Sequence, residues 1–327
     1  MIARQLTLVV TIALALLAAP FGAAAQQAAK VHRIGILSSS PPTTRLSELL
    51  RQSLGELGFV EGRNLSIDWR NAEGKAERFD YLAAELVRLK VEVIVATTPG
   101  TVFAARRATR SIPIVMVNTP DPVQLGLVSS LGRPGGNITG TTSLSVDLSI
   151  KQLELLKAAV PRVSRFALVW NPTNPWHPVA VKGIEEGARS LGVQLQILEV
   201  RGPEDFDNAF AAITRERSGA ALVLADPVTF THRTRLAALA AEHHLPTMYG
   251  LREHTEVGGL MSYWADSTDL YRRTGVYVGK ILNGAIPANL PIEQPTKFEF
   301  VINLRTAKAL SLTIPQALLL RADHIVE

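Results

Sequence analysis

The sequence contains no cysteine, which excludes disulfides, thiolate catalysis, cysteine-based metal sites and lipid attachment to an N-terminal cysteine. Charged residues are also few, at 19% of the 327 residues. The formal net charge of +5 is carried by no long run of lysine or arginine, so the sequence does not indicate a nucleic-acid-binding surface. Hydrophobic residues make up 47% of the chain, which is enough to bury a sizeable core and too many for a disordered protein.

Motifs of catalysis and nucleotide binding are missing as well. The chain has no G-x-S-x-G and no G-x-x-x-x-G-K-[ST], and the glycines of residues 135–140 do not fit G-x-G-x-x-G. None of the seven histidines has the spacing of a metal site. The sequence therefore predicts no catalytic residue, no metal and no cofactor.

Residues 1–25 have the pattern of a secretory signal peptide. Arg4 supplies a positive charge, residues 6–18 are apolar, and residues 23–25 (Ala-Ala-Ala) form a small-residue cleavage site before Gln26. The alternative is a membrane anchor, because the uncharged stretch continues to residue 25. No other stretch approaches the roughly 20 apolar residues that span a bilayer. We therefore expect an exported periplasmic protein that has no membrane span after cleavage and is not a lipoprotein.

Short apolar runs alternate with amphipathic segments along the remaining chain. Residues 93–96 and 114–117 are continuous runs rich in valine and isoleucine, which suit a parallel sheet buried on both faces. The alternation predicts a doubly wound α/β fold. It is interrupted at residues 133–140 by proline and glycine and then restarts. We therefore predict two Rossmann-like doubly wound lobes joined by three hinge crossings, near residues 141–145, 264–267 and 286–295.

The predicted N-terminal lobe comprises residues 31–143 plus 267–285, and the C-terminal lobe comprises residues 144–266 plus 296–327. The predicted strands are residues 33–37, 65–70, 93–96, 114–117, 165–169, 194–200, 221–224, 247–249, 259–263 and 298–302. The predicted helices are residues 45–57, 75–89, 101–109, 146–160, 179–191, 206–214, 231–243, 269–282 and 305–310.

Polar residues that follow the predicted strands are the candidates for ligand binding, because ligands of parallel sheets bind beyond the carboxyl ends of the strands. In the N-terminal lobe the candidates are Ser39, Ser40, Thr97, Thr98 and Thr119. Hydroxyls and backbone N–H groups near helix starts suit a ligand carboxylate. Helix capping or solvation of the loops is the alternative.

In the C-terminal lobe, polar and aromatic residues after strands or near crossings are the candidates: Asn171, Asn174, Asp226, Tyr249, Tyr263 and Asp266. An acid such as Asp226 can hold a ligand amino group by a charge-assisted hydrogen bond, and the tyrosine rings suit a planar ligand. The alternatives are turn formation, helix capping and core or hinge packing. Asp121, in contrast, is expected to cap the helix that starts at Pro122.

Several sequence blocks together resemble the ABC transporter substrate-binding proteins of the tryptophan/tyrosine-binding type, which are type I periplasmic binding proteins. The blocks are D-P-V at 121–123, G-L-V at 126–128, Leu131, R-P-G-G-N-I-T-G at 133–140, R-A-D at 321–323, and W-R at 69–70 before Gly74. The resemblance covers residues 31–327. It implies two lobes that close on a small-molecule ligand and delivery of the ligand to an ABC permease with a cytoplasmic ATPase. We expect the protein to be a monomer.

The ligand and the downstream partner stay open at this stage. Amino-acid binders of the family have an acid near Asp226, but they more often place a small polar pair after it, where this chain has Pro-Val-Thr-Phe at 227–230. The resemblance points to an amino acid or aromatic compound, and the basic composition points to an anion. A periplasmic sensory partner of a receptor kinase is an alternative with the same fold, and an exported enzyme is a third.

Overall fold

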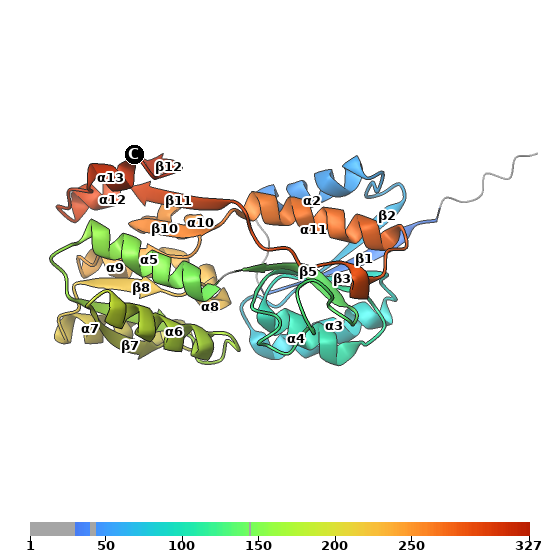
Figure 1. The fold of residues 1–327 in the computed structure, drawn as a ribbon, viewed down its shortest axis with the longest axis horizontal. Coiled ribbons are helices and arrows are strands. Elements are labelled where there is room, and N and C mark those ends of the chain that lie inside the picture. Colours follow the sequence, from blue (N-terminus) through green and yellow to red (C-terminus); the bar gives the residue numbers. More distant parts are fainter. Residues whose placement is uncertain (1–29, 40–43, 144) are drawn as a thin grey trace, which may run out of the picture. The chain divides into compact units, whose positions relative to one another are not determined.

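The computed structural model describes residues 30–39, 44–143 and 145–327 of the chain (Figure 1). The predicted signal peptide and Ser40 lie outside these residues. The described part forms two sheets, each with helices packed on both faces, which confirms the prediction of two α/β lobes.

The N-terminal lobe is built on a five-stranded parallel sheet with the order β2-β1-β3-β4-β5. Its strands are β1 (His32–Ser38), β2 (Leu65–Asn71), β3 (Val93–Ala96), β4 (Ile114–Pro120) and β5 (Ile138–Ser143). One face packs against α2 (Thr44–Glu56) and α11 (Ser267–Leu282), and the other packs against α3 (Phe79–Arg88) and α4 (Pro99–Ala108). Successive strand residues supply the two cores in turn, because side chains of a strand alternate between its faces.

The C-terminal lobe is built on a seven-stranded sheet with the order β12-β11-β10-β9-β8-β6-β7, in which only the β10–β11 pair is antiparallel. Its strands are β6 (Arg165–Trp170), β7 (Gln194–Glu199), β8 (Ala220–Val223), β9 (Thr247–Tyr249), β10 (Met261–Ala265), β11 (Phe298–Asn303) and β12 (His324–Val326). The helices on one face are α5 (Ser145–Ala159), α6 (His177–Ser190), α12 (Leu304–Ala309) and α13 (Gln316–Leu319). The other face packs against α7 (Phe206–Arg215) and α9 (Arg233–Glu242).

Two short helices, α8 (Pro227–Thr231) and α10 (Arg252–Glu256), follow β8 and β9 directly. The continuous helix predicted for residues 231–243 is therefore shorter, and α8 and α9 meet at His232. Among the described residues, no helix is long and apolar enough to cross a membrane.

The chain passes between the two sheets after β5, after β10 and before β11, and the last passage is hydrogen-bonded to both others. The backbone N–H of Thr142 donates to the carbonyl oxygen of Glu293 at 2.9 Å. The backbone N–H of Glu293 donates to the carbonyl oxygen of Gly140 at 3.1 Å. The N–H of Asp266 donates to the carbonyl oxygen of Lys297 at 3.0 Å. The three connecting segments therefore form one hydrogen-bonded unit.

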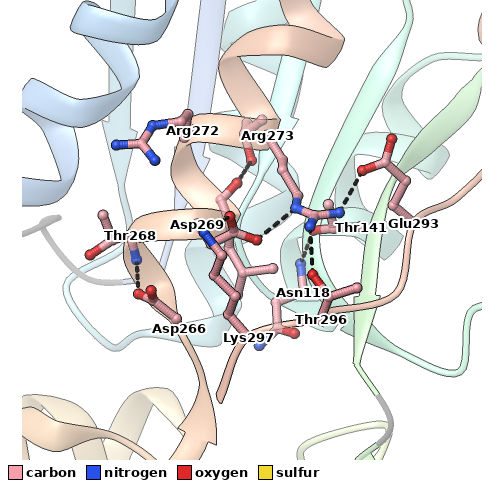
Figure 2. Close-up of polar contacts among 12 residues, drawn as sticks. Asn118, Thr141, Asp266, Thr268, Asp269, Arg272, Arg273, Glu293, Thr296 and Lys297 are labelled. Atoms are coloured by element: carbon pink, nitrogen blue, oxygen red, sulfur yellow. Dashed lines mark hydrogen bonds and ion pairs between the residues drawn. The ribbon is translucent and has the colours of Figure 1, made fainter. Parts of the chain in front are cut away.

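Side chains strengthen this unit at the start of α11, as Figure 2 shows. Arg273 lies 2.7 Å from Asp269 and 2.8 Å from Glu293, and its third nitrogen donates to Thr296 at 2.9 Å. Lys297 adds an ion pair to Asp269 at 3.5 Å. These contacts hold the first turns of α11 to the segment before β11.

Two strands were missed by sequence reasoning, β5 and the short β12 near the C-terminus. Residues 133–140 were expected to break the pattern, but residues 138–143 (I-T-G-T-T-S) form β5 at the edge of the first sheet. This strand has no apolar run, because hydroxyl groups replace hydrophobic side chains in it. Thr139 donates to the carbonyl oxygen of Leu290 at 2.8 Å and Thr142 to that of Thr119 at 2.7 Å, which satisfies these hydroxyls inside the protein.

Candidate ligand-binding site

A cavity of about 230 Å³ lies at the carboxyl ends of strands from both sheets. In the first sheet, Ser39 follows β1 and Thr97 and Thr98 follow β3, and these two strands are neighbours where the strand order reverses. In the second sheet, Asn174 follows β6 and Asp226 follows β8, which are again neighbours at the point of reversal. Such switch points are where open α/β sheets bind their ligands.

The threonines after β3 line the cavity and also build the start of α4. Thr98 caps the helix reciprocally: its hydroxyl accepts from the N–H of Thr101 at 3.4 Å, while its own N–H donates to the Thr101 hydroxyl at 2.9 Å. Thr97 is held by its N–H, which donates to the carbonyl oxygen of Leu37 at 3.2 Å. Capping and ligand contact are therefore compatible here, because the cap itself orients the hydroxyls at the cavity wall.

The carboxylate of Asp226 is surrounded by N–H donors. Its Oδ1 accepts from the Asn171 amide at 3.0 Å and from the N–H of Val228 at 2.9 Å, and its Oδ2 accepts from the Asn174 amide at 3.0 Å. Asp226 is only 5% exposed and forms the N-cap of α8. It joins the loop after β6 to the loop after β8 and so shapes this wall of the cavity.

His177 lies next to this carboxylate and is buried. Its Nδ1 accepts from the N–H of Asn171 at 3.0 Å, so the proton of the neutral ring is on Nε2, which lies 3.2 Å from the carbonyl oxygen of Ala225. Burial lowers the pKa of His177, and the charge of Asp226 opposes this effect. The ring therefore stays neutral and serves as a fixed part of the wall.

Another part of the cavity wall carries three aromatic side chains and one acid. Phe230 comes from α8, Trp264 from β10, Tyr271 from α11 and Glu253 from α10. Burial raises the pKa of Tyr271 to about 12, and the charge of Glu253 adds to this rise. Burial also raises the pKa of Glu253 itself. This side of the cavity therefore suits a planar apolar group with a polar end.

Comparison with known proteins agrees with this arrangement. The profile of a family described as ABC transporter substrate binding protein matches residues 36–326. This chain belongs to that family. Among curated proteins, the tyrosine-binding protein of Clostridioides difficile strain R20291 is 26% identical over 286 residues, which are 86% of this chain and 82% of that protein.

Solved structures show the same fold for this substrate-binding protein. The ABC domain from Streptococcus pneumonia in complex with L-Trp superposes with a TM-score of 0.85 at 24% identity, covering 91% of this chain and all of that one. A conserved domain protein from Vibrio cholerae gives a TM-score of 0.84 at 28% identity, covering 90% of this chain and all of that one. The type I periplasmic binding protein fold expected from the sequence is thereby confirmed.

The structure brings five of the predicted site residues to the cavity, and they are Ser39, Thr97, Thr98, Asn174 and Asp226. Ser40 lies outside the described residues. Asn171 is buried behind Asp226 and supports it by the amide contact described above.

Thr119 does not line the cavity, whereas its neighbour Asn118 does. The pairing of β4 with β5 shifts register between Met116 and Thr119, and Asn118 has a left-handed φ of 50°. Such a bulge exchanges the faces of successive side chains. Thr119 is consequently buried completely and Asn118 takes the position at the wall.

Three other candidates lie outside the cavity lining and make internal contacts. Tyr249 is fully buried and stacks on His254 with ring centroids 4.6 Å apart. Tyr263 stacks on Phe298 at 6.0 Å. Asp266 caps α11 by accepting from the N–H of Thr268 at 2.8 Å. These three residues therefore fit core packing and helix capping, which are the alternatives to ligand binding given above.

Sequence reasoning missed Phe230, Glu253, Trp264 and Tyr271. Glu253 follows β9 by four residues, so the rule of strand ends applies to it, but Tyr249 at the strand end was chosen in its place. Trp264 and Tyr271 belong to the segment where β10 passes into α11, and only the path of the chain between the lobes shows that they face the cavity.

The buried histidine behind this wall makes stability sensitive to acid. His254 is 1% exposed, and burial lowers its pKa to about 4 although contacts with the carbonyl oxygens of Leu251 and Thr229 oppose the shift. The unfolded value is about 6.5, so the unfolded chain binds the extra proton first and stability falls as the pH drops through this window. We expect protonation of the His254 site to lower the free energy of unfolding by about 2 kcal/mol as the pH falls from about 7 to about 5.

The measurement is urea unfolding at both pH values for the wild type, His254→Asn and His244→Asn. His244→Asn is the control, because it also replaces a histidine but at an exposed position. Relative to the wild type, His254→Asn should reduce the pH dependence of stability by about 2 kcal/mol. An unchanged pH dependence in His254→Asn would show that the ring takes up its proton without loss of stability.

Proposed function

We propose that this chain is a periplasmic solute-binding protein of an ABC import system. It captures a small organic ligand in the cavity between the strand ends and delivers it to a membrane permease with a cytoplasmic ATPase. Support comes from one arrangement above all: residues of both lobes, at the switch point of each sheet, line the same cavity. The proposal includes export by residues 1–25, as the sequence predicts.

The ligand we propose is aromatic, either an amino acid or a related compound. Aromatic residues are 6% of the chain, yet Phe230, Trp264, Tyr271 and Trp176 all line this cavity. The tyrosine-binding relative and the L-Trp complex favour the same class. The cavity of about 230 Å³ is also smaller than the roughly 300–1,000 Å³ of sites for drug-sized molecules.

Delivery requires that the ligand change the conformation of the protein. A ligand that contacts both lobes binds the closed form more tightly than the open form, and this difference in affinity shifts the population towards closure. The hydrogen-bonded connecting segments with Arg273 are the place where the angle between the lobes would change. The permease then recognises the closed form.

The test is ligand binding by protein that has been refolded to remove any copurified ligand. Aromatic amino acids and related acids and amines, each at about 100 times the dissociation constant, should add about 2.7 kcal/mol of stability, a rise of several degrees in the melting temperature. Trp264→Leu should abolish the rise. Trp69→Leu is the matched control, because Trp69 packs on the same core but does not line the cavity.

Two results would count against the proposal. A rise that persists in Trp264→Leu would move the ligand to another site. No rise across the panel would favour a role without an aromatic ligand, such as the sensory partner considered from the sequence.

A further inference from the structure

One acid at the cavity, Glu253, has no side-chain partner in the part of the chain that the structure describes. Among the described residues, no other side chain forms a hydrogen bond or ion pair with Glu253, and its carboxyl is hydrogen-bonded to its own backbone N–H at the start of α10. Asp226 differs, because three N–H donors already occupy its two oxygens. Of these two acids, Glu253 is therefore the one with acceptor capacity left for a ligand.

The two neighbouring arginines, Arg252 and Arg233, interact with other groups. Arg252 pairs with Glu256 and Glu299, each at 2.8 Å. Arg233 lies over the ring of Phe230, 4.9 Å from its centroid, and donates to the carbonyl oxygen of the same residue.

The local charges leave the Glu253 carboxylate poorly compensated. The charge of Arg233 lowers the pKa of Glu253, but burial and the charges of Glu256 and Glu299 raise it. An ionised carboxylate in such surroundings is stabilised most by a positively charged group on the ligand.

The side chains around Glu253 suit an organic cation better than a metal ion. Trp264, Tyr271 and Phe230 line the same cavity. Aromatic faces attract ammonium groups, and a carboxylate adds a charge-assisted hydrogen bond. Among the described residues, no group of three or more histidine and acidic side chains is placed to hold a metal.

We propose that Glu253 is the charge partner of an ammonium group on the ligand, so that the site selects small aromatic amines and amino acids over aromatic acids that lack the amine. This inference rests on the proposed function, in which the cavity is the ligand site. It assigns the amine to α10 rather than to the acid after β8. Asp226 then acts as the structural support of the opposite wall.

The experiment compares three probes that share one ring system: L-tryptophan, tryptamine, which lacks the carboxylate, and indole-3-propionate, which lacks the ammonium. Calorimetric titration of the wild type should show tighter binding of tryptophan and tryptamine than of indole-3-propionate. Glu253→Gln keeps the shape of the side chain and removes the charge. It should weaken binding of the two amines about 10- to 100-fold, the size of one charge-assisted hydrogen bond, and leave indole-3-propionate unchanged or bound more tightly.

Glu242→Gln is the control, because Glu242 is an exposed acid at the end of α9 and does not line the cavity. It should leave all three affinities unchanged. Glu253→Gln should also be at least as stable as the wild type without ligand, since it removes a buried, unpaired charge.

The possible failures are distinct. If the wild type binds indole-3-propionate as tightly as the amines, or if Glu253→Gln affects all three probes equally, the cavity remains the ligand site and the ammonium assignment is overturned. If the wild type binds none of the three, the proposal of an aromatic ligand falls together with the assignment.

Discussion

Replacing Asp226 by alanine is expected to lower the free energy of unfolding of the ligand-free protein by about 3–5 kcal/mol. The substitution removes the acceptor of the Asn171 and Asn174 amides and the N-cap of α8 in one step. Asn171 is buried, so its amide cannot turn to water and keeps the full penalty of an unsatisfied donor. The loops after β6 and β8 also lose the group that joins them.

Urea unfolding of ligand-free protein, followed by tryptophan fluorescence, measures this loss. Asp80→Ala is a suitable control, because Asp80 is 65% exposed and its pair with Arg107 lies at the surface. Exposed pairs contribute about 1 kcal/mol or less. A loss of this small size in Asp226→Ala would mean that the two amides find other acceptors. The Asp226 carboxylate of the wild type would then be available to bind ligand.

The two acids of the cavity thus give opposite predictions. Both are acidic side chains beyond the carboxyl end of a strand in the same sheet, and the sequence alone does not rank them. Asp226 is engaged by three donors, so its removal should harm the fold. Within the described part of the chain, Glu253 is engaged by none outside its own backbone, so its removal should harm the binding of an amine. The number of partners within the protein, rather than residue type, separates a supporting group from a binding group.

The helices and strands were predictable wherever the sequence has a clear hydrophobic periodicity. Strands such as β3 and β8 consist of four buried apolar residues each, and helices such as α3 and α7 present one apolar face, so local sequence decides their structure. β5 was not predictable by this rule, because its stability comes from hydroxyl groups that bond to distant carbonyls such as that of Leu290. Tertiary contacts of this kind leave no periodic signal.

The candidate site was predictable to the extent that it follows strand ends. Ser39, Thr97 and Asn174 come directly or soon after strands next to a switch point, and topology alone brings such residues together. Thr119 and Asn118 exchanged places because a bulge in β4 shifts the register, and a bulge is not visible in a single sequence. The aromatic wall depends on how the chain passes between the lobes, which the sequence does not specify locally.

The second large effect is expected at Gly140 in β5, one of the two strands that sequence reasoning missed. Gly140 pairs with Met116 of β4 and has a φ of +129°, which side chains rarely adopt. A β-carbon at this position would lie 2.2 Å from the carbonyl oxygen and 2.8 Å from the nitrogen of Met116. Both atoms are backbone, and β4 is held between β3 and β5, so it cannot retreat.

Gly140→Ala should therefore lower the free energy of unfolding by about 3–6 kcal/mol, the sum of backbone strain and overpacking. Gly55→Ala is the matched control, since Gly55 lies in α2 and an added β-carbon meets no atom within 4 Å beyond its own helix backbone and chain neighbours. This substitution should raise helix stability by about 1 kcal/mol. Because the carbonyl of Gly140 accepts from Glu293, displacement of β5 should also loosen the connection between the lobes, which hydrogen exchange at Glu293 would detect. Unfolding curves of Gly140→Ala and the wild type that coincide would contradict the steric argument and indicate that β5 shifts along β4 at little cost.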